Sequence, residues 1–202
     1  MRLFPKLRKK LLRQVGAFYV CGQGGTAFWG GRGGRVLNNT FKNIRNMDGT
    51  GVQGPSVQAL YLDDQMSGWE VAGNSFINCM AGSFIGGGRD NHVHNNYYER
   101  CDLAQHFDNR GMGWEQSLCN CTNGSTCDPF VAKQIVDEWP DFVAAYPQIR
   151  TAVLGGQDIC VPVNNVIEDN RYCKVGQYLD ATAEQISGWH STARNNSEVH
   201  TC

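Results

Sequence analysis

The sequence lacks a long hydrophobic run: no apolar stretch reaches the 18 or so residues that a membrane-spanning helix needs. It also lacks an excess of charge of either sign, because 18 basic residues stand against 19 acidic ones. Neither nucleic acid nor a membrane is therefore an expected partner. Proline is scarce, with six residues against 24 glycines, which suits a chain with many tight corners. For 202 residues we expect one domain.

Similar short segments recur along the chain. An asparagine followed two positions later by an aromatic residue occurs in NNTFKNI (38–44), GNSFINC (73–79), NNYYERC (95–101) and DNRYCKV (169–175). A second strip recurs as AFWGG (27–31), LYLDD (60–64), SFIGG (83–87), QHFDN (105–109) and QYLDA (177–181). Two short alternating strips in each period predict strands rather than helices.

Repeats of about 22 to 26 residues are too short to bury their own apolar side, so we expect them to stack as coils. Strands of successive coils then pair in parallel, and equivalent residues form columns. Two inward columns are expected: Leu62, Ile85, Phe107 and Leu179, and Phe41, Phe76, Tyr98 and Tyr172. Because asparagine suits turns, a ladder is expected from Asn39, Asn74, Asn96 and Asn170.

The strings YLDD, SGW, IGGGRDN and HFDNRGMGW resemble the right-handed parallel β-helix proteins of the pectin-lyase-like superfamily. The resemblance covers roughly residues 24–111 and 160–198. It implies an all-β fold, a right-handed parallel β-helix of about five coils. It also implies activity on carbohydrates, since known members are largely polysaccharide lyases, glycoside hydrolases and epimerases.

Two segments depart from the repeat. Residues 1–23 carry six basic residues before position 14 and no clear signal peptide, so we expect a cap of the coil or the start of a longer chain. The β-helix domain, 24–202, is interrupted by residues 112–162, whose apolar positions recur at spacings of three and four. This spacing predicts two short helices in a lid-like insertion. The related β-helix proteins carry a similar insertion.

The nine cysteines are an odd number, so at least one is unpaired within a monomer. Cys79 and Cys101 share one repeat position, and a stack of buried thiols is favoured there over a disulfide. The insertion is expected to contain at least one disulfide among Cys119, Cys121, Cys127 and Cys160, since their spacing does not suit zinc. Disulfides, together with glycosylation sequons at Asn38, Asn120, Asn123 and Asn195, favour an extracellular or secretory location.

The outward positions of the second strip predict the functional site. An aromatic column is expected from Phe28, Tyr61, Phe84, His106 and Tyr178, with acidic residues two positions on at Asp63, Asp108 and Asp180. Aromatic rings stack on sugars, and paired carboxyl groups hydrolyse glycosidic bonds. We therefore expect Asp63 and Asp108 to be the acid–base pair of an inverting glycoside hydrolase, with a gap over Gly86 between them. Asp64 is the substitute for Asp63, and His106 would orient Asp108. Substrate contacts are expected from Tyr61, Arg89, Asp90, Arg110, Trp114, Tyr178 and Asp180.

Two other functions stay open. A polysaccharide lyase or epimerase would use Arg89 or Arg110 on a uronate and acidic residues to hold calcium, whereas the hydrolase needs no cofactor. A carbohydrate-binding or structural β-helix, or a fragment of one, would not be catalytic. In that case Asp63 and Asp64 would cap a turn, and Asp108 would lock one by pairing with Arg110.

Overall fold

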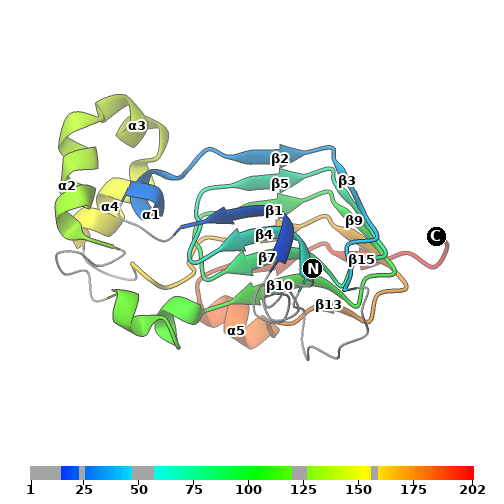
Figure 1. Ribbon diagram of the computed structural model, residues 1–202. Helices are drawn as coiled ribbons and strands as arrows, with labels where there is room; N and C mark the ends of the chain where they lie inside the picture. The colour runs from blue at the N-terminus through cyan, green and yellow to red at the C-terminus, as the bar shows by residue number, and fades with distance from the viewer. Residues whose placement is uncertain (1–14, 23–25, 47–56, 120–126, 156–158) are drawn as a thin grey trace, which may run out of the picture.

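A computed structural model of the protein describes residues 15–22, 26–46, 57–119, 127–155 and 159–202 (Figure 1). Its strands form three five-stranded parallel sheets. The first contains β1 (Val15–Cys21), β4 (Val57–Asp63), β7 (Ala81–Gly86), β10 (Leu103–Asp108) and β13 (Gln177–Leu179), in that order. The second contains β2 (Arg35–Leu37), β5 (Glu70–Ala72), β8 (His92–His94), β11 (Val166–Glu168) and β14 (Thr192–Arg194). The third contains β3 (Thr40–Lys42), β6 (Ser75–Ile77), β9 (Tyr97–Glu99), β12 (Arg171–Cys173) and β15 (Ser197–Glu198).

The chain visits the three sheets in turn. Strands β4, β5 and β6 belong to different sheets, and β7, β8 and β9 then pair with them in the same order. Each circuit therefore adds one strand to every sheet, and the sheets lie around a common core (Figure 1). This arrangement fits a parallel β-helix with about five coils, as the repeats predicted.

The predicted core columns are confirmed with one exception. Leu62, Ile85 and Phe107 occupy one register position in β4, β7 and β10. The fourth expected member, Leu179, pairs instead with Gln105, two positions earlier. The second column is complete, and its aromatic rings stack at centroid distances of 5.0 Å for Phe41–Phe76 and 4.9 Å for Phe76–Tyr98, with Tyr172 next in register.

The asparagine ladder is confirmed. The side-chain oxygen of each ladder asparagine accepts a hydrogen bond from the backbone N–H of the one before it, at 2.9 Å for Asn39 to Asn74 and for Asn74 to Asn96, and at 3.0 Å for Asn96 to Asn170. The side-chain nitrogen of Asn96 donates to the carbonyl of Val71 in the preceding coil. The repeats did not reveal a second ladder, which lies just before β8 and β11. The backbone N–H of Asn91 donates to the side-chain oxygen of Asn165, and the backbone N–H of Asn165 donates to the hydroxyl of Ser191.

Helices replace strands at two places. Residues 27–31 were expected to be a strand, but Thr26–Gly30 is helix α1, and β1 takes the expected place beside β4. Of residues 1–23, the structure describes Val15–Cys21 as this strand, and the basic residues expected to form a cap lie outside the described residues. The described part of the insertion has three α-helices where two were expected: α2 (Pro129–Glu138), α3 (Pro140–Ala145) and α4 (Pro147–Gly155), because a proline begins each. They gather with α1 at one side of the sheets (Figure 1), and α5 (Ala183–Gly188) lies apart.

A disulfide joins Cys119 to Cys160 across the insertion, as predicted, and a second, unforeseen one joins Cys173 to Cys202. Cys79 and Cys101 are buried thiols, as expected. Among the described residues, no helix has the length and apolar character that crossing a bilayer requires.

Candidate functional site

One register position of the first sheet holds a row of aromatic rings in contact, edge-to-face for Tyr19–Tyr61, tilted for Tyr61–Phe84 and stacked for Phe84–His106. Centroid distances are 5.3 Å for Tyr19–Tyr61, 4.3 Å for Tyr61–Phe84 and 3.9 Å for Phe84–His106. Parallel pairing explains this row, because these residues share one register position in β1, β4, β7 and β10. The predicted register of Tyr61, Phe84 and His106 is thus observed, but Tyr61 and Phe84 are buried, at 0% and 6% exposed, so these two rings are not an open face for a sugar.

Two members of the expected column lie elsewhere. Phe28 is buried in α1 among the helices of the insertion, and Tyr19 takes its place in the row. Tyr178 was misplaced because β13 pairs two positions away from the expected register. Its ring stacks on Tyr172 at 4.3 Å, and its hydroxyl accepts a hydrogen bond from Gln105. Asp180, rather than Tyr178, therefore lies beside His106.

The gap expected between Asp63 and Asp108 is filled by Arg110. A Cβ atom added to Gly86 would lie only 2.5 Å from the Arg110 Cζ, so the absence of a side chain there makes room for the guanidinium. The Arg110 Nη1 donates to Asp63 at 2.6 Å and to Asp64 at 3.1 Å, and its Nη2 donates to Asp108 at 2.8 Å. An attacking water cannot occupy this space, so the expectation of an open gap over Gly86 is wrong.

Asp63 and Arg110 are buried, each only 4% exposed. The second carboxyl oxygen of Asp63 accepts a hydrogen bond from the Tyr19 hydroxyl at 2.9 Å. Burial alone would lower the pKa of Arg110, but the hydrogen bonds and charge of Asp108 raise it. The guanidinium also contacts the rings of Phe84 and Trp114 at 5.1 and 5.3 Å. Arg110 is thus a permanent cation inside the protein, and Trp114, 70% exposed, lies over it.

His106 joins two partly exposed acids. It hydrogen-bonds Asp108 through Nε2 at 3.0 Å and Asp180 through Nδ1. Burial alone would lower the pKa of His106, but these two partners raise it to about 9. Burial alone would likewise raise the pKa of Asp108, but His106 and Arg110 lower it to about 2. At neutral pH, His106 is therefore a cation and Asp108 a carboxylate.

Glu115 completes the group and was missed at the sequence level. It follows the 3₁₀ turn η1 (Arg110–Met112), where its backbone N–H donates to the Arg110 carbonyl. Its side chain is 1% exposed. Gln65 donates to Oε2 at 3.2 Å, while Oε1 has no hydrogen-bond partner among the described residues. Burial first, and the neighbouring Asp64 second, raise the pKa of Glu115 to about 8. No sequence pattern indicated a role for Glu115, because this residue belongs to neither repeat strip.

Arg89 and Asp90 belong to a different group of charges. Asp90 accepts from Arg32 at 2.7 Å, from Arg89 at 3.3 Å and from Asn164 at 3.0 Å. The Arg32 and Asp90 side chains are 3% and 7% exposed. This buried ion pair holds the turn between β7 and β8 against the segment that follows α1.

One cluster has the ligand types of a cation site. Donor atoms of Cys21, Asp63 and Asp64 lie within 4.8 Å of one another. The Cys21 thiol donates to Asp64 at 3.4 Å, and Arg110 donates to both aspartates. A cation would have to compete with the guanidinium, so the arrangement gives calcium no specific support.

The chain matches no protein-family model, and searches of curated proteins and of solved structures likewise found no similar protein.

Proposed function

We propose that the protein is a glycoside hydrolase acting on a polysaccharide, built on a right-handed parallel β-helix of the pectin-lyase-like type. The observation that supports this proposal is the contrast between Glu115 and Asp108 around Arg110. At neutral pH Glu115 retains its proton and Asp108 does not. Two carboxyl groups with opposite pKa shifts are what a general acid and a general base require. The two disulfides fit an extracellular location.

The proposed roles differ from those that the repeats suggested. Glu115 would protonate the oxygen of the leaving sugar, and Asp108 would take a proton from the water that attacks the anomeric carbon. The C–O bond breaks as the new C–O bond to water forms, and solvent later restores both protonation states. Asp63 and Asp64 would position Arg110, whose guanidinium also holds Asp108. His106 would orient Asp108, and Trp114 would stack on a sugar ring above the site.

A lyase is less well supported, because the Arg110 guanidinium is already bound by three aspartates and is not available to a uronate. A non-catalytic carbohydrate-binding β-helix is the second candidate. The burial of Asp63 and Arg110 favours it, since a buried ion network of this kind also stabilises a fold.

The test is an assay of reducing ends on a panel of polysaccharides, with absorbance of unsaturated products measured in parallel. The hydrolase proposal expects reducing ends without that absorbance. Glu115→Gln should lower kcat by about 10²- to 10⁴-fold, and Asp108→Asn similarly. Glu70→Gln, in an ion pair on the second sheet, is the control and should keep full activity. In the wild type, kcat/KM should fall as pH rises above about 8, where Glu115 loses its proton.

Full activity of Glu115→Gln would refute the assignment of the general acid. Retention on immobilised glycans with no cleavage of any polysaccharide would leave the binding module as the function. Thermal melting of each variant separates a lost catalytic group from a lost fold.

A further inference from the structure

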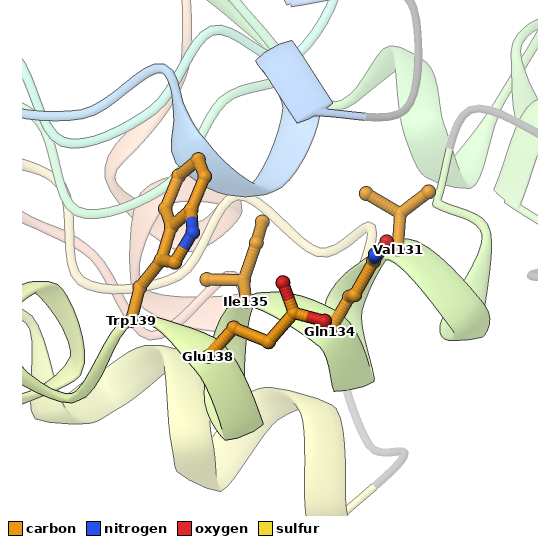
Figure 2. Close-up of a pocket in the computed structure, with 5 residues that line it drawn as sticks. All are labelled: Val131, Gln134, Ile135, Glu138 and Trp139. Carbon is orange, nitrogen blue, oxygen red and sulfur yellow. The ribbon is translucent and has the colours of Figure 1, made fainter.

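The helical insertion contains a hollow of about 110 Å³, away from the acidic group of the first sheet. One face of α2 lines it, since the lining residues recur at spacings of three and four: Val131, Gln134, Ile135, Glu138 and Trp139. Figure 2 shows the Trp139 indole at one end, then Ile135 with the Glu138 carboxyl group near it, and the Gln134 amide beside Val131 at the other end. The indole is 48% exposed, whereas Ile135 is buried.

The packing of α2 against its neighbours fixes the walls of the hollow. Ala132 and Ile135 anchor α2 against Phe28 and Trp29, and the disulfide from Cys119 to Cys160 closes the insertion at its base. Gly30 of α1 lies opposite: a Cβ atom there would be 3.7 Å from the Ile135 Cδ1 and 3.8 Å from the Trp139 Cζ3. A larger residue at position 30 would therefore extend into the space that glycine leaves.

We propose that this hollow binds a single neutral pyranose ring, an inference that rests on the proposed carbohydrate function and adds a second binding site to it. The apolar face of a pyranose matches the exposed indole, and its hydroxyl groups match the Gln134 amide and the Glu138 carboxyl group. The volume is well below the roughly 300 Å³ at which pockets for drug-sized ligands begin, so it suits one ring. A uronic acid would bring its carboxylate against the acidic Glu138, which favours a neutral sugar.

Binding of methyl glycosides of glucose, galactose and mannose, measured by saturation-transfer NMR and calorimetry, tests the site, with galacturonic acid as the charged comparison. Trp139→Ala should weaken binding of the preferred glycoside at least tenfold.

Phe130→Ala is the matched control, because Phe130 is an aromatic residue of α2 that is 66% exposed and does not line the hollow. The affinity of this variant for the glycoside should be unchanged. Gly30→Met, which fills the hollow from the opposite helix, should abolish binding without removing any lining residue. Glu138→Gln should narrow the preference for the neutral sugar over galacturonic acid.

No binding of any neutral glycoside by the wild type would overturn the inference. So would equal losses in Trp139→Ala and Phe130→Ala, or full binding in Gly30→Met. Glu115→Gln and Asp108→Asn separate this inference from the proposed function. If no polysaccharide is cleaved but glycoside binding depends on Trp139, the hydrolase proposal fails and the sugar site stands. If cleavage depends on Glu115 but Trp139→Ala binds glycosides normally, the sugar site fails and the hydrolase stands.

Discussion

Arg110 is the residue that joins the acidic side chains of the first sheet into one group. It is buried and reaches Asp63 at the end of β4, Asp64 just after that strand, and Asp108 at the end of β10, with β7 between the two strands. Buried charges are tolerated only when they are paired, so the buried Asp63 depends on the guanidinium, whereas Asp108 also pairs with His106. The structural alternative in which Asp108 pairs with Arg110 beside a turn is confirmed. The sequence could suggest that pair because the residues are two positions apart, but not the reach of Arg110 across Gly86 to Asp63.

Arg110→Met should destabilise the protein by on the order of 3–5 kcal/mol, because it leaves Asp63 and Asp108 without their shared cation. Urea unfolding at neutral pH measures the change. Arg35→Met is the control, since Arg35 also pairs with an acidic residue, Glu70, but its side chain is 62% exposed. It should change stability by less than about 1 kcal/mol. Similar losses in the two variants would mean that burial of the Arg110 network contributes nothing.

At the scale of the elements, prediction succeeded where the repeat itself determines structure. The asparagines and the Phe41–Tyr172 column were placed correctly, because parallel pairing brings equivalent residues of successive coils together. It failed for β13, since matching QYLDA to QHFDN letter by letter aligned Asp180 with Asp108. The observed register puts Asp180 beside His106, where its carboxyl group also accepts the backbone N–H of Phe107. For α1, burial of Phe28 and Trp29 against α2 outweighed the strand-like pattern.

A buried asparagine inside the ladder should contribute more to the free energy of unfolding than the exposed asparagine at its end. Asn96→Ala removes side-chain bonds to Asn74, Val71 and Asn170 at a site that is 1% exposed. It should therefore destabilise the protein by about 1–3 kcal/mol. Asn39→Ala, at the exposed end of the same ladder, should lose less than half of that in the same denaturation experiment. A larger loss at Asn39 would contradict the role of burial.

The disulfide of the insertion should stabilise the molecule through the loop that it closes. Cys119 and Cys160 are 41 residues apart, and a loop of this length corresponds to a stabilisation of roughly 2–4 kcal/mol. Replacing both by serine should lower the melting temperature accordingly, as calorimetry would show. The loss should appear without a reducing agent, and the reducing agent should then have a smaller effect on the variant than on the wild type. If a reducing agent lowered the melting temperature of the variant and the wild type equally, the Cys119–Cys160 disulfide would not be the bond whose reduction destabilises the protein.

At the scale of the whole molecule, the fold was predictable and the site was not, for one physical reason. A repeat fixes which residues share a position in successive coils, so the first and third sheets follow from the two strips, whereas the second sheet (β2, β5, β8, β11 and β14) belongs to neither strip and was not predicted. The site instead depends on side chains outside the repeat: Tyr19 from β1, Arg110 and Trp114 from the turn after β10, and Glu115 beneath it. Tyr19, Arg110 and Glu115 contact residues 44, 47 and 50 positions away in sequence, and no local pattern encodes those contacts.

Asp108, His106 and Glu115 have shifted pKa values and should together make the stability of the whole protein depend on pH. The pKa of Asp108 falls from its ordinary 3.8 to about 2, so its contribution is present above about pH 4 and is lost as pH falls through 2. The pKa of His106 rises from 6.5 to about 9, so its contribution is present below 6.5 and is lost as pH rises through 9. Glu115 rises from 4.5 to about 8, and because the folded state holds this proton more tightly, stability is lost between those values.

Stability should therefore be highest near pH 4 to 5 and should fall by on the order of 2–4 kcal/mol between pH 5 and 9. Urea unfolding at pH 5, 7 and 9 measures this slope. Glu115→Gln cannot ionise and should flatten the part between pH 5 and 8, whereas His106→Gln should flatten the part between 6.5 and 9. His200→Gln, at an exposed position near the end of the chain, is the control and should keep the wild-type profile. A wild-type profile that is level from pH 5 to 9 would show that neither proton is held more tightly by the folded protein, and the same result would remove Glu115 as a general acid.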